Sequence, residues 1–259
     1  MANPVQKVPS RQNLKNAVGL VRDFGYLEFN TLDMVTFMDD FMGDQIKDEW
    51  ENTSSGTGSA APAVVQDSAN GEVLLTGGTA NGASFCHMQQ GSSHFQGQLN
   101  ACIAVRIKPS LIAGNKVEIG LVDTAANLGF VNALNDADET TTVRGTNGVV
   151  WVFDPAHDTD KWQLVGAKAG TVVKKVSSSA PAPAAGTYQT LVISIMDDSA
   201  TGYVLNSDGY QVYSTGPLAA AVTSTTGLTP WVNTTCISSS SACNATIDYV
   251  KAWQRRTVN

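Results

Sequence analysis

The chain has 259 residues, of which only 15 % are charged and 7 % aromatic, and its formal net charge is −7. A negative balance argues against a nucleic-acid binder, whose binding face is basic. No apolar run approaches the roughly 18 residues of a membrane-spanning helix. The first residues lack the apolar stretch and cleavage site of a secretory signal, so we expect synthesis in the cytosol. A chain of this length can form a large core without a metal or a disulfide.

The predicted N-terminal arm, residues 1–36, differs from the rest in charge. Within its first 24 positions four basic residues stand against Asp23, which gives this part +3 and the remainder −10; the basic residues are Lys7, Arg11, Lys15 and Arg22. Ser10 is a suitable N-cap for a short helix that Gly25 would end. One face of this helix would carry Leu14, Ala17, Val18 and Val21. The helix either packs on its own chain's sandwich or docks on an acidic neighbour or a sister subunit.

Residues 37–259 consist of short period-two stretches separated by turn residues. The clearest case is 188–214, where Asp-Asp-Ser and Asn-Ser-Asp-Gly turns separate three predicted strands. Asn70-Gly71 predicts a hairpin, whereas the Ser-, Gly-, Thr- and Ala-rich segment 53–62 predicts a loop. Because such strands need a second layer to bury a face, we expect an all-β fold. It would be an antiparallel two-sheet sandwich at 37–259, preceded by the arm.

Four segments carry a resemblance to a known fold. They are the opening Phe37–Phe41 (FMDDF) with Trp50, the strand 117–123 (VEIGLVD), the central hairpin within 188–214 and the closing strand 247–254 (IDYVKAWQ). Together they resemble concanavalin A-like jelly-roll domains, which include laminin-G-like modules and family-sixteen glycoside hydrolases. The resemblance implies a closing strand that pairs beside the opening one.

A narrower resemblance comes from the combination of GLVD, an acidic loop, LTPWVNTT and DYVKAWQRR. This combination resembles sandwich proteins of tailed-bacteriophage virions. It implies a structural protein of the capsid surface, made in the host cytoplasm, with the major capsid protein as partner. A homo-oligomer, with a trimer favoured, is expected.

In the hydrolase branch of this fold, catalysis requires two carboxylates at alternate positions of one strand. Here Glu118 is followed by Gly120 where the second carboxylate should stand, and Asp123 would face the opposite side of a regular strand. We therefore expect no catalytic residues, no enzyme activity, and a hydrogen-bonded or solvated Glu118.

The histidines, acidic clusters and cysteines are the candidate metal ligands and disulfide partners of this chain. His87, His94 and His157 match no zinc spacing, so we expect no cofactor. Calcium remains an alternative at three acidic clusters: Asp136, Asp138 and Glu139; Asp154, Asp158 and Asp160; and Asp197 with Asp198. Cys236 and Cys243 bracket a Ser-rich loop and are a candidate disulfide in oxidising surroundings, although thiols are the default in a cytosol. Cys86 and Cys102 are expected to be buried thiols.

Two functions follow from these features. The first is a capsid decoration protein, with a fibre subunit as a close variant, whose arm docks through Arg11, Leu14, Lys15, Val18, Val21 and Arg22. The alternative is a lectin-like module of a phage head or tail fibre, which binds surface glycans. Its candidate stacking residues are Trp151, Trp162 and Trp231, although core positions are the plainer interpretation of these tryptophans.

Overall fold

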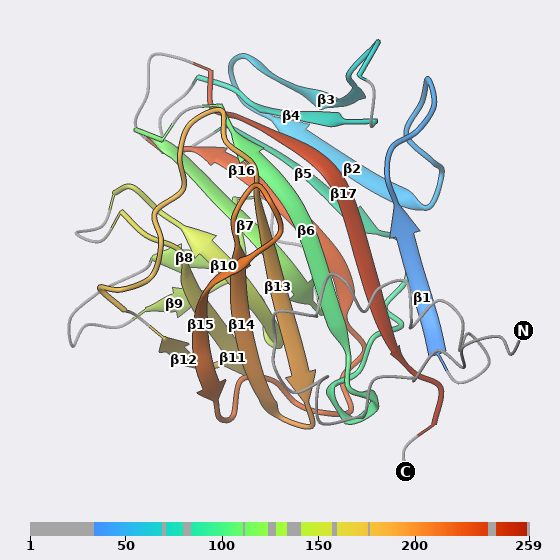
Figure 1. Cartoon of the computed structure of the whole chain (residues 1–259), viewed down its shortest axis with the longest axis vertical. Helices are drawn as coiled ribbons and strands as arrows, with labels where there is room; N and C mark the ends of the chain where they lie inside the picture. Colours follow the sequence, from blue (N-terminus) through green and yellow to red (C-terminus); the bar gives the residue numbers. More distant parts are fainter. Residues whose placement is uncertain are drawn as a thin grey trace, which may run out of the picture.

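The computed structural model describes residues 34–68, 71–79, 84–110, 112–123, 128–133, 141–156, 160–175, 177–237 and 242–257. Over these residues two antiparallel sheets lie face to face, and a short two-stranded ribbon packs on one of them (Figure 1). The predicted helix of the arm and all six of its candidate docking residues lie outside the described residues. The described part of the chain holds no helix with the length and hydrophobicity that a bilayer crossing requires.

Sheet A has eight strands in the described part of the chain. Their order is β15-β14-β13-β6-β17-β4-β3, and β1 also pairs with β17. The bounds are β1 Met34–Asp39, β3 Ser59–Val64, β4 Val73–Gly77, β6 Cys102–Pro109, β13 Gln189–Met196, β14 Ser199–Leu205, β15 Gln211–Leu218 and β17 Asn244–Arg255.

Sheet B has seven strands among the described residues, in the order β12-β11-β10-β7-β16-β5-β2. The bounds are β2 Trp50–Ser55, β5 Ser84–Gln90, β7 Asn115–Val122, β10 Gly148–Phe153, β11 Gln163–Lys168, β12 Thr171–Lys175 and β16 Thr229–Cys236. The ribbon consists of β8 Val131–Ala133 and β9 Thr142–Val143, and a single 3-10 turn spans Gly97–Leu99.

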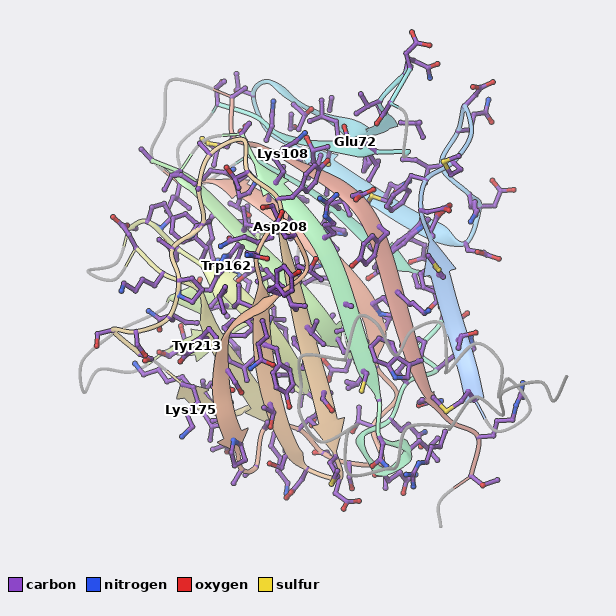
Figure 2. All side chains as sticks on the ribbon, in the orientation of Figure 1. Glu72, Lys108, Trp162, Lys175, Asp208 and Tyr213 are labelled. Atoms are coloured by element: carbon purple, nitrogen blue, oxygen red, sulfur yellow. The ribbon has the colours of Figure 1, made fainter. Side chains whose placement is uncertain are left out.

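The core lies between the two sheets. Alternate residues of each strand point inward, as period-two patterning requires, and those of the central strands are fully buried. Examples are Ile103 and Val105 on β6 and Val117 and Ile119 on β7. The all-β, two-sheet prediction is therefore confirmed. On the outer surface Glu72 and Lys108 lie close together, with Nζ 3.6 Å from Oε1 (Figure 2).

The predicted three-stranded stretch at 188–214 is confirmed as β13, β14 and β15, which are consecutive neighbours in sheet A. The closing strand pairs beside the opening one, as the resemblance implied. This pairing runs from Met34 opposite Arg255 to Asp39 opposite Val250. Strand β1 begins at Met34, so the sandwich includes residues 34–36 that the sequence placed in the arm.

The loop predicted at 53–62 is wrong. Strand β2 continues to Ser55, and β3 begins at Ser59 after a turn at Gly56–Gly58. Both strands lie at sheet edges and are largely exposed, so small polar residues do not leave the core unfilled. Pro62 is tolerated because β3 is an edge strand whose register shifts between Ala60 and Ala63.

The opening motif is held together by Asp39. Its buried carboxylate accepts hydrogen bonds from Phe41 N at 3.0 Å and Trp50 Nε1 at 2.7 Å, and Lys47 Nζ lies 2.8 Å away. The Phe37 ring meets the Trp50 ring edge-on, with centroids 5.2 Å apart. These contacts fix β1 of sheet A relative to β2 of sheet B at the open edge of the sandwich.

Candidate functional site

Strand β7 carries the carboxylate that a hydrolase of this fold would need. Because Val117, Ile119 and Leu121 face the core, the residues of opposite parity, Lys116 and Glu118, point to the outer face of sheet B. On that face the β8–β9 ribbon covers the sheet, and Phe130 and Val131 pack in one buried cluster with residues of β7, β10, β11 and β16.

Glu118 binds this ribbon. Its side chain is fully buried, Oε2 accepts a hydrogen bond from Phe130 N at 2.8 Å, and Oε1 accepts one from Val131 N at 2.9 Å. Lys116 Nζ lies 3.3 Å from Oε1. Burial raises the pKa of the Glu118 carboxyl, against the effect of the Lys116 charge and the two amide donors. The hydrogen-bonded interpretation of Glu118 is therefore confirmed. Asp123, the other acid of this segment, accepts a hydrogen bond from Asn147 N at 2.8 Å.

The three candidate sugar-stacking tryptophans cannot stack on a ligand at the surface. Trp151, Trp162 and Trp231 each have an exposed fraction of 0 %. Trp151 donates to Val192 O at 3.0 Å, and Trp162, which belongs to the core between the sheets, donates to Gln189 Oε1 at 2.8 Å. Trp231 packs beneath the ribbon. The reason is that sheet B is covered on both faces here, so residues of either parity are buried.

The four cysteines are buried thiols, and no disulfide joins Cys236 to Cys243 in the described residues. Cys243 Sγ donates to Gly114 O at 3.3 Å. Burial raises the pKa of Cys86 to about 12 and that of Cys102 to about 11.

Six of the candidate metal ligands lie within the described residues, namely His87, His94, Asp154, Asp160, Asp197 and Asp198. His87 is buried on β5, and burial lowers its pKa to about 4. Asp154 Oδ2 lies 3.8 Å from Lys116 Nζ, and Asp198 Oδ2 lies 2.8 Å from Lys168 Nζ. Within the described ranges no group of three or more His, Cys, Asp or Glu side chains could hold a metal ion. Outside those ranges lie Asp136, Asp138, Glu139, His157 and Asp158.

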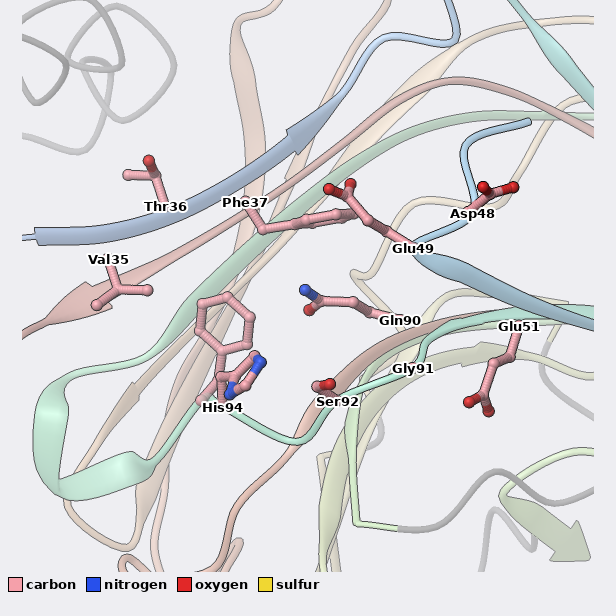
Figure 3. Close-up of a pocket in the computed structure, with 11 residues that line it drawn as sticks. Val35, Thr36, Phe37, Asp48, Glu49, Glu51, Gln90, Gly91, Ser92 and His94 are labelled. Carbon is pink, nitrogen blue, oxygen red and sulfur yellow. The ribbon is translucent and has the colours of Figure 1, made fainter. Parts of the chain in front are cut away.

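A cleft opens at the edge of the sandwich, between β1 of sheet A and the β2–β5 edge of sheet B. It encloses about 500 Å³, which lies within the usual range of ligand sites. Its walls come from three separated segments, namely 35–37, 48–51 and 90–95 (Figure 3). We call it the edge cleft.

Polar groups converge in the edge cleft above an apolar floor. Figure 3 shows the Gln90 amide pointing into the space between β1 and the 91–94 segment, with Glu49 on one side and Ser92 and His94 on the other. Phe37 and Phe95 form the apolar floor of the cleft. Gln90 Oε1 is buried and has no hydrogen-bond partner among the described residues. A buried acceptor of this kind is costly unless a ligand or water donates to it.

The edge cleft was not predicted from the sequence. Its only sequence feature was the acidic run Asp48-Glu49 with Glu51 around Trp50, which reads equally well as a solvated turn. Two hydrogen bonds hold the walls of the cleft in place. Gly91 N donates to Glu49 O at 3.0 Å, and Gln254 Nε2 at the end of β17 donates to His94 O at 2.7 Å.

No family model and no curated protein match this sequence. Solved structures do match its fold. A protein of unknown function from Shewanella oneidensis MR-1 is 15 % identical, with 100 % of this chain and 98 % of that chain covered and a TM-score of 0.57. The β-glucanase of Bacillus licheniformis is 16 % identical over 84 % and 97 %, with a TM-score of 0.53. Peanut lectin is 11 % identical over 87 % and 99 %, with a TM-score of 0.54. The chain thus shares the concanavalin A-like jelly-roll fold.

These neighbours correct one expectation. We expected no enzyme activity because β7 lacks the second carboxylate, but the β-glucanase and other glycan-cleaving enzymes are among the structures that share this fold. The absence of one strand pattern therefore does not exclude an enzyme.

Proposed function

We propose that this protein binds carbohydrate, and that the edge cleft is the binding site. The observation that carries the proposal is the buried Oε1 of Gln90, which has no hydrogen-bond partner in the described part of the chain and lies in a cleft of about 500 Å³. A sugar hydroxyl is a donor that fits this acceptor, and the amide nitrogen of the same side chain can donate in return.

The surrounding groups suit the same ligand. Glu49 supplies carboxylate acceptors, Ser92 a hydroxyl and His94 an imidazole, while the buried Phe37 and Phe95 form the apolar floor behind these groups. The fold supports the proposal in a general way, since a lectin and a β-glucanase share it.

A glycan array, followed by calorimetry on the best ligand, tests this proposal. Gln90→Ala should weaken binding at least about tenfold, because it removes a buried hydrogen-bonding amide. Gln211→Ala is the matched control, since this glutamine lies on β15 at the far edge of sheet A. Chromatography of the same mixtures distinguishes binding from cleavage. An array without ligands, or a Gln90→Ala variant that binds normally, contradicts the proposal.

The phage setting is a separate proposal that rests on sequence resemblance alone. According to this proposal, the protein is displayed on a virion as a homo-oligomer in contact with the major capsid protein. Its edge cleft would then bind glycans of the host surface. Co-sedimentation with empty capsids tests the capsid contact independently of any sugar.

A further inference from the structure

Three charged side chains lie together beneath the β8–β9 ribbon, far from the edge cleft. Lys116 Nζ lies 3.3 Å from Glu118 Oε1 and 3.8 Å from Asp154 Oδ2. It also donates a hydrogen bond to Val131 O, and the amide of the same ribbon residue donates to Glu118. The exposed fractions of the Lys116, Glu118 and Asp154 side chains are 3 %, 0 % and 5 %. We call these three residues the buried triad.

Strand pairing brings Lys116 and Asp154 together. Phe153 at the end of β10 lies opposite Val117 on β7, so Asp154 and Lys116 follow as neighbours on adjacent strands. Both point to the outer face of sheet B, because Val117 and Phe153 belong to the core between the sheets. Asp154 Oδ1 accepts a hydrogen bond from Ala156 N at 3.1 Å, which holds the carboxylate with Oδ2 toward Lys116.

The buried triad is unbalanced as a set of ions. Two carboxylates and one ammonium carry one excess negative charge, and buried ions are costly even when they are paired. Burial raises the pKa of Glu118, which favours its neutral form. The remaining separation of 3.8 Å between Lys116 Nζ and Asp154 Oδ2 is longer than a hydrogen bond. A neutral amide between these two side chains would remove both charges from the interior.

We propose that Lys116 and Asp154 are joined in the mature protein by an isopeptide bond, with Glu118 as the catalytic residue. The Glu118 carboxylate takes a proton from the Lys116 ammonium, and the resulting amine attacks Asp154 Cγ. The Nζ–Cγ bond forms, and the bond from Cγ to one carboxyl oxygen breaks. Glu118 passes two protons from nitrogen to that oxygen, which leaves as water, and Glu118 returns to its starting state.

The structure supplies what this reaction needs. The three groups are held in place by strands β7 and β10 and by the ribbon, and reactants fixed in this way behave as if they were highly concentrated. The condensation requires no metal, oxidant or nucleotide. Its product would close the loop from 116 to 154 covalently, and such a link restricts the unfolded chain as a disulfide does. The four cysteines of this chain are thiols and form no such link.

The mass of the intact full-length protein tests the bond. Once peptide mapping has confirmed both chain ends, the protein should weigh one water less than its sequence requires. Proteolysis should release a branched peptide that joins the segments around Lys116 and Asp154. A full mass overturns the proposal, and so does a water lost within a linear peptide, which indicates a succinimide. Because this measurement uses the unaltered chain, it decides the proposal whether or not any variant folds.

Variants of the two linked residues identify the bond. Lys116→Arg and Asp154→Ala should both have the full mass of their sequences, because a guanidinium stays protonated and alanine has no carboxyl carbon to attack. Asp198→Ala is the matched control. Asp198 Oδ2 lies closer to a lysine, 2.8 Å from Lys168 Nζ, but this pair is exposed to solvent. The control should therefore keep the loss of one water, and a full mass in it would contradict the assignment.

Glu118→Gln tests the catalytic role. Removal of a general base slows such a step about 10²-fold or more, so the freshly purified variant should be largely unlinked. If this variant lacks the near-UV circular dichroism of the wild type, Glu118→Asp takes its place. That variant keeps a carboxylate at a greater distance and should show a lower linked fraction. A variant that links as completely as the wild type shows that Glu118 is not the catalytic residue.

Discussion

Gly129 lies directly against the buried carboxylate of Glu118. A Cβ at position 129 would stand 2.3 Å from Glu118 Oε2, and the Gly129 backbone has a φ of +99°. Only glycine combines that conformation with that approach. The contact lets the next two amides, of Phe130 and Val131, reach the carboxylate. The carboxylate of Glu118 therefore attaches the β8–β9 ribbon to sheet B, and Gly129 is required for this attachment.

Replacing Gly129 by alanine should destabilise the protein by about 2–4 kcal/mol, because the added methyl group displaces the carboxylate in addition to the backbone strain. Gly170→Ala is the control, since Gly170 has a φ of +81° and open space around its Cβ position. The control should cost only about 1 kcal/mol. Urea unfolding measures both, and equal losses would show that the contact with Glu118 contributes nothing.

Glu118→Gln should change how stability depends on pH. Burial raises the folded-state pKa of Glu118 above its unfolded value of about 4.3. The native protein therefore loses stability as the pH rises from that value through the folded-state pKa. Glutamine does not titrate, so the variant should lack this decline. Urea midpoints measured from about pH 4 to pH 8 test this, with the exposed Glu51→Gln as control; parallel curves for variant and wild type would contradict it.

Protonation of His87 should lower the stability of the folded protein at acidic pH. Burial lowers its pKa to about 4 from a usual value near 6.5. The stability linked to neutral His87 is present above about pH 6.5 and is lost as the pH falls toward 4, by up to about 3 kcal/mol. His87→Gln should reduce that acid loss, whereas His94→Gln should not. Thermal melts across this range supply the measurement, and an unaltered acid limb in His87→Gln would refute the assignment.

Asp39→Ala should cost about 3–5 kcal/mol, because it leaves Trp50 Nε1 and Phe41 N without their acceptor in a buried position. Lys47→Ala removes only a half-exposed partner of the same carboxylate and should cost no more than about 1 kcal/mol. Chemical denaturation with Trp fluorescence reports both variants. A similar loss in the two would mean that the ion pair, and not the Trp50 hydrogen bond, holds β1 to β2.

Local patterns predicted the parts of this fold that depend on local chemistry. The alternation at 191–196 and the turn at 206–209 correspond to β13–β15, and the closing strand appears where its pattern placed it. The Asn70-Gly71 hairpin corresponds to the pairing of β3 with β4, but β2 and the first part of β3 were missed because exposed edge strands do not need apolar alternation. The burial of Trp231 could not be predicted from the sequence. The alternation of a strand indicates which face of the sheet a residue lies on, but not whether another segment covers that face. The edge cleft joins residues from positions 35 to 95, and only tertiary structure brings them together.

The position of β17 has a consequence for biosynthesis. Residues 244–255 lie in the middle of sheet A and pair with β6, β4 and β1. During translation these three strands leave the ribosome long before the strand that joins them, and each presents an open edge in the meantime. The nascent chain is therefore most exposed to aggregation just before synthesis of its last dozen sandwich residues, whose release allows the sheet to close.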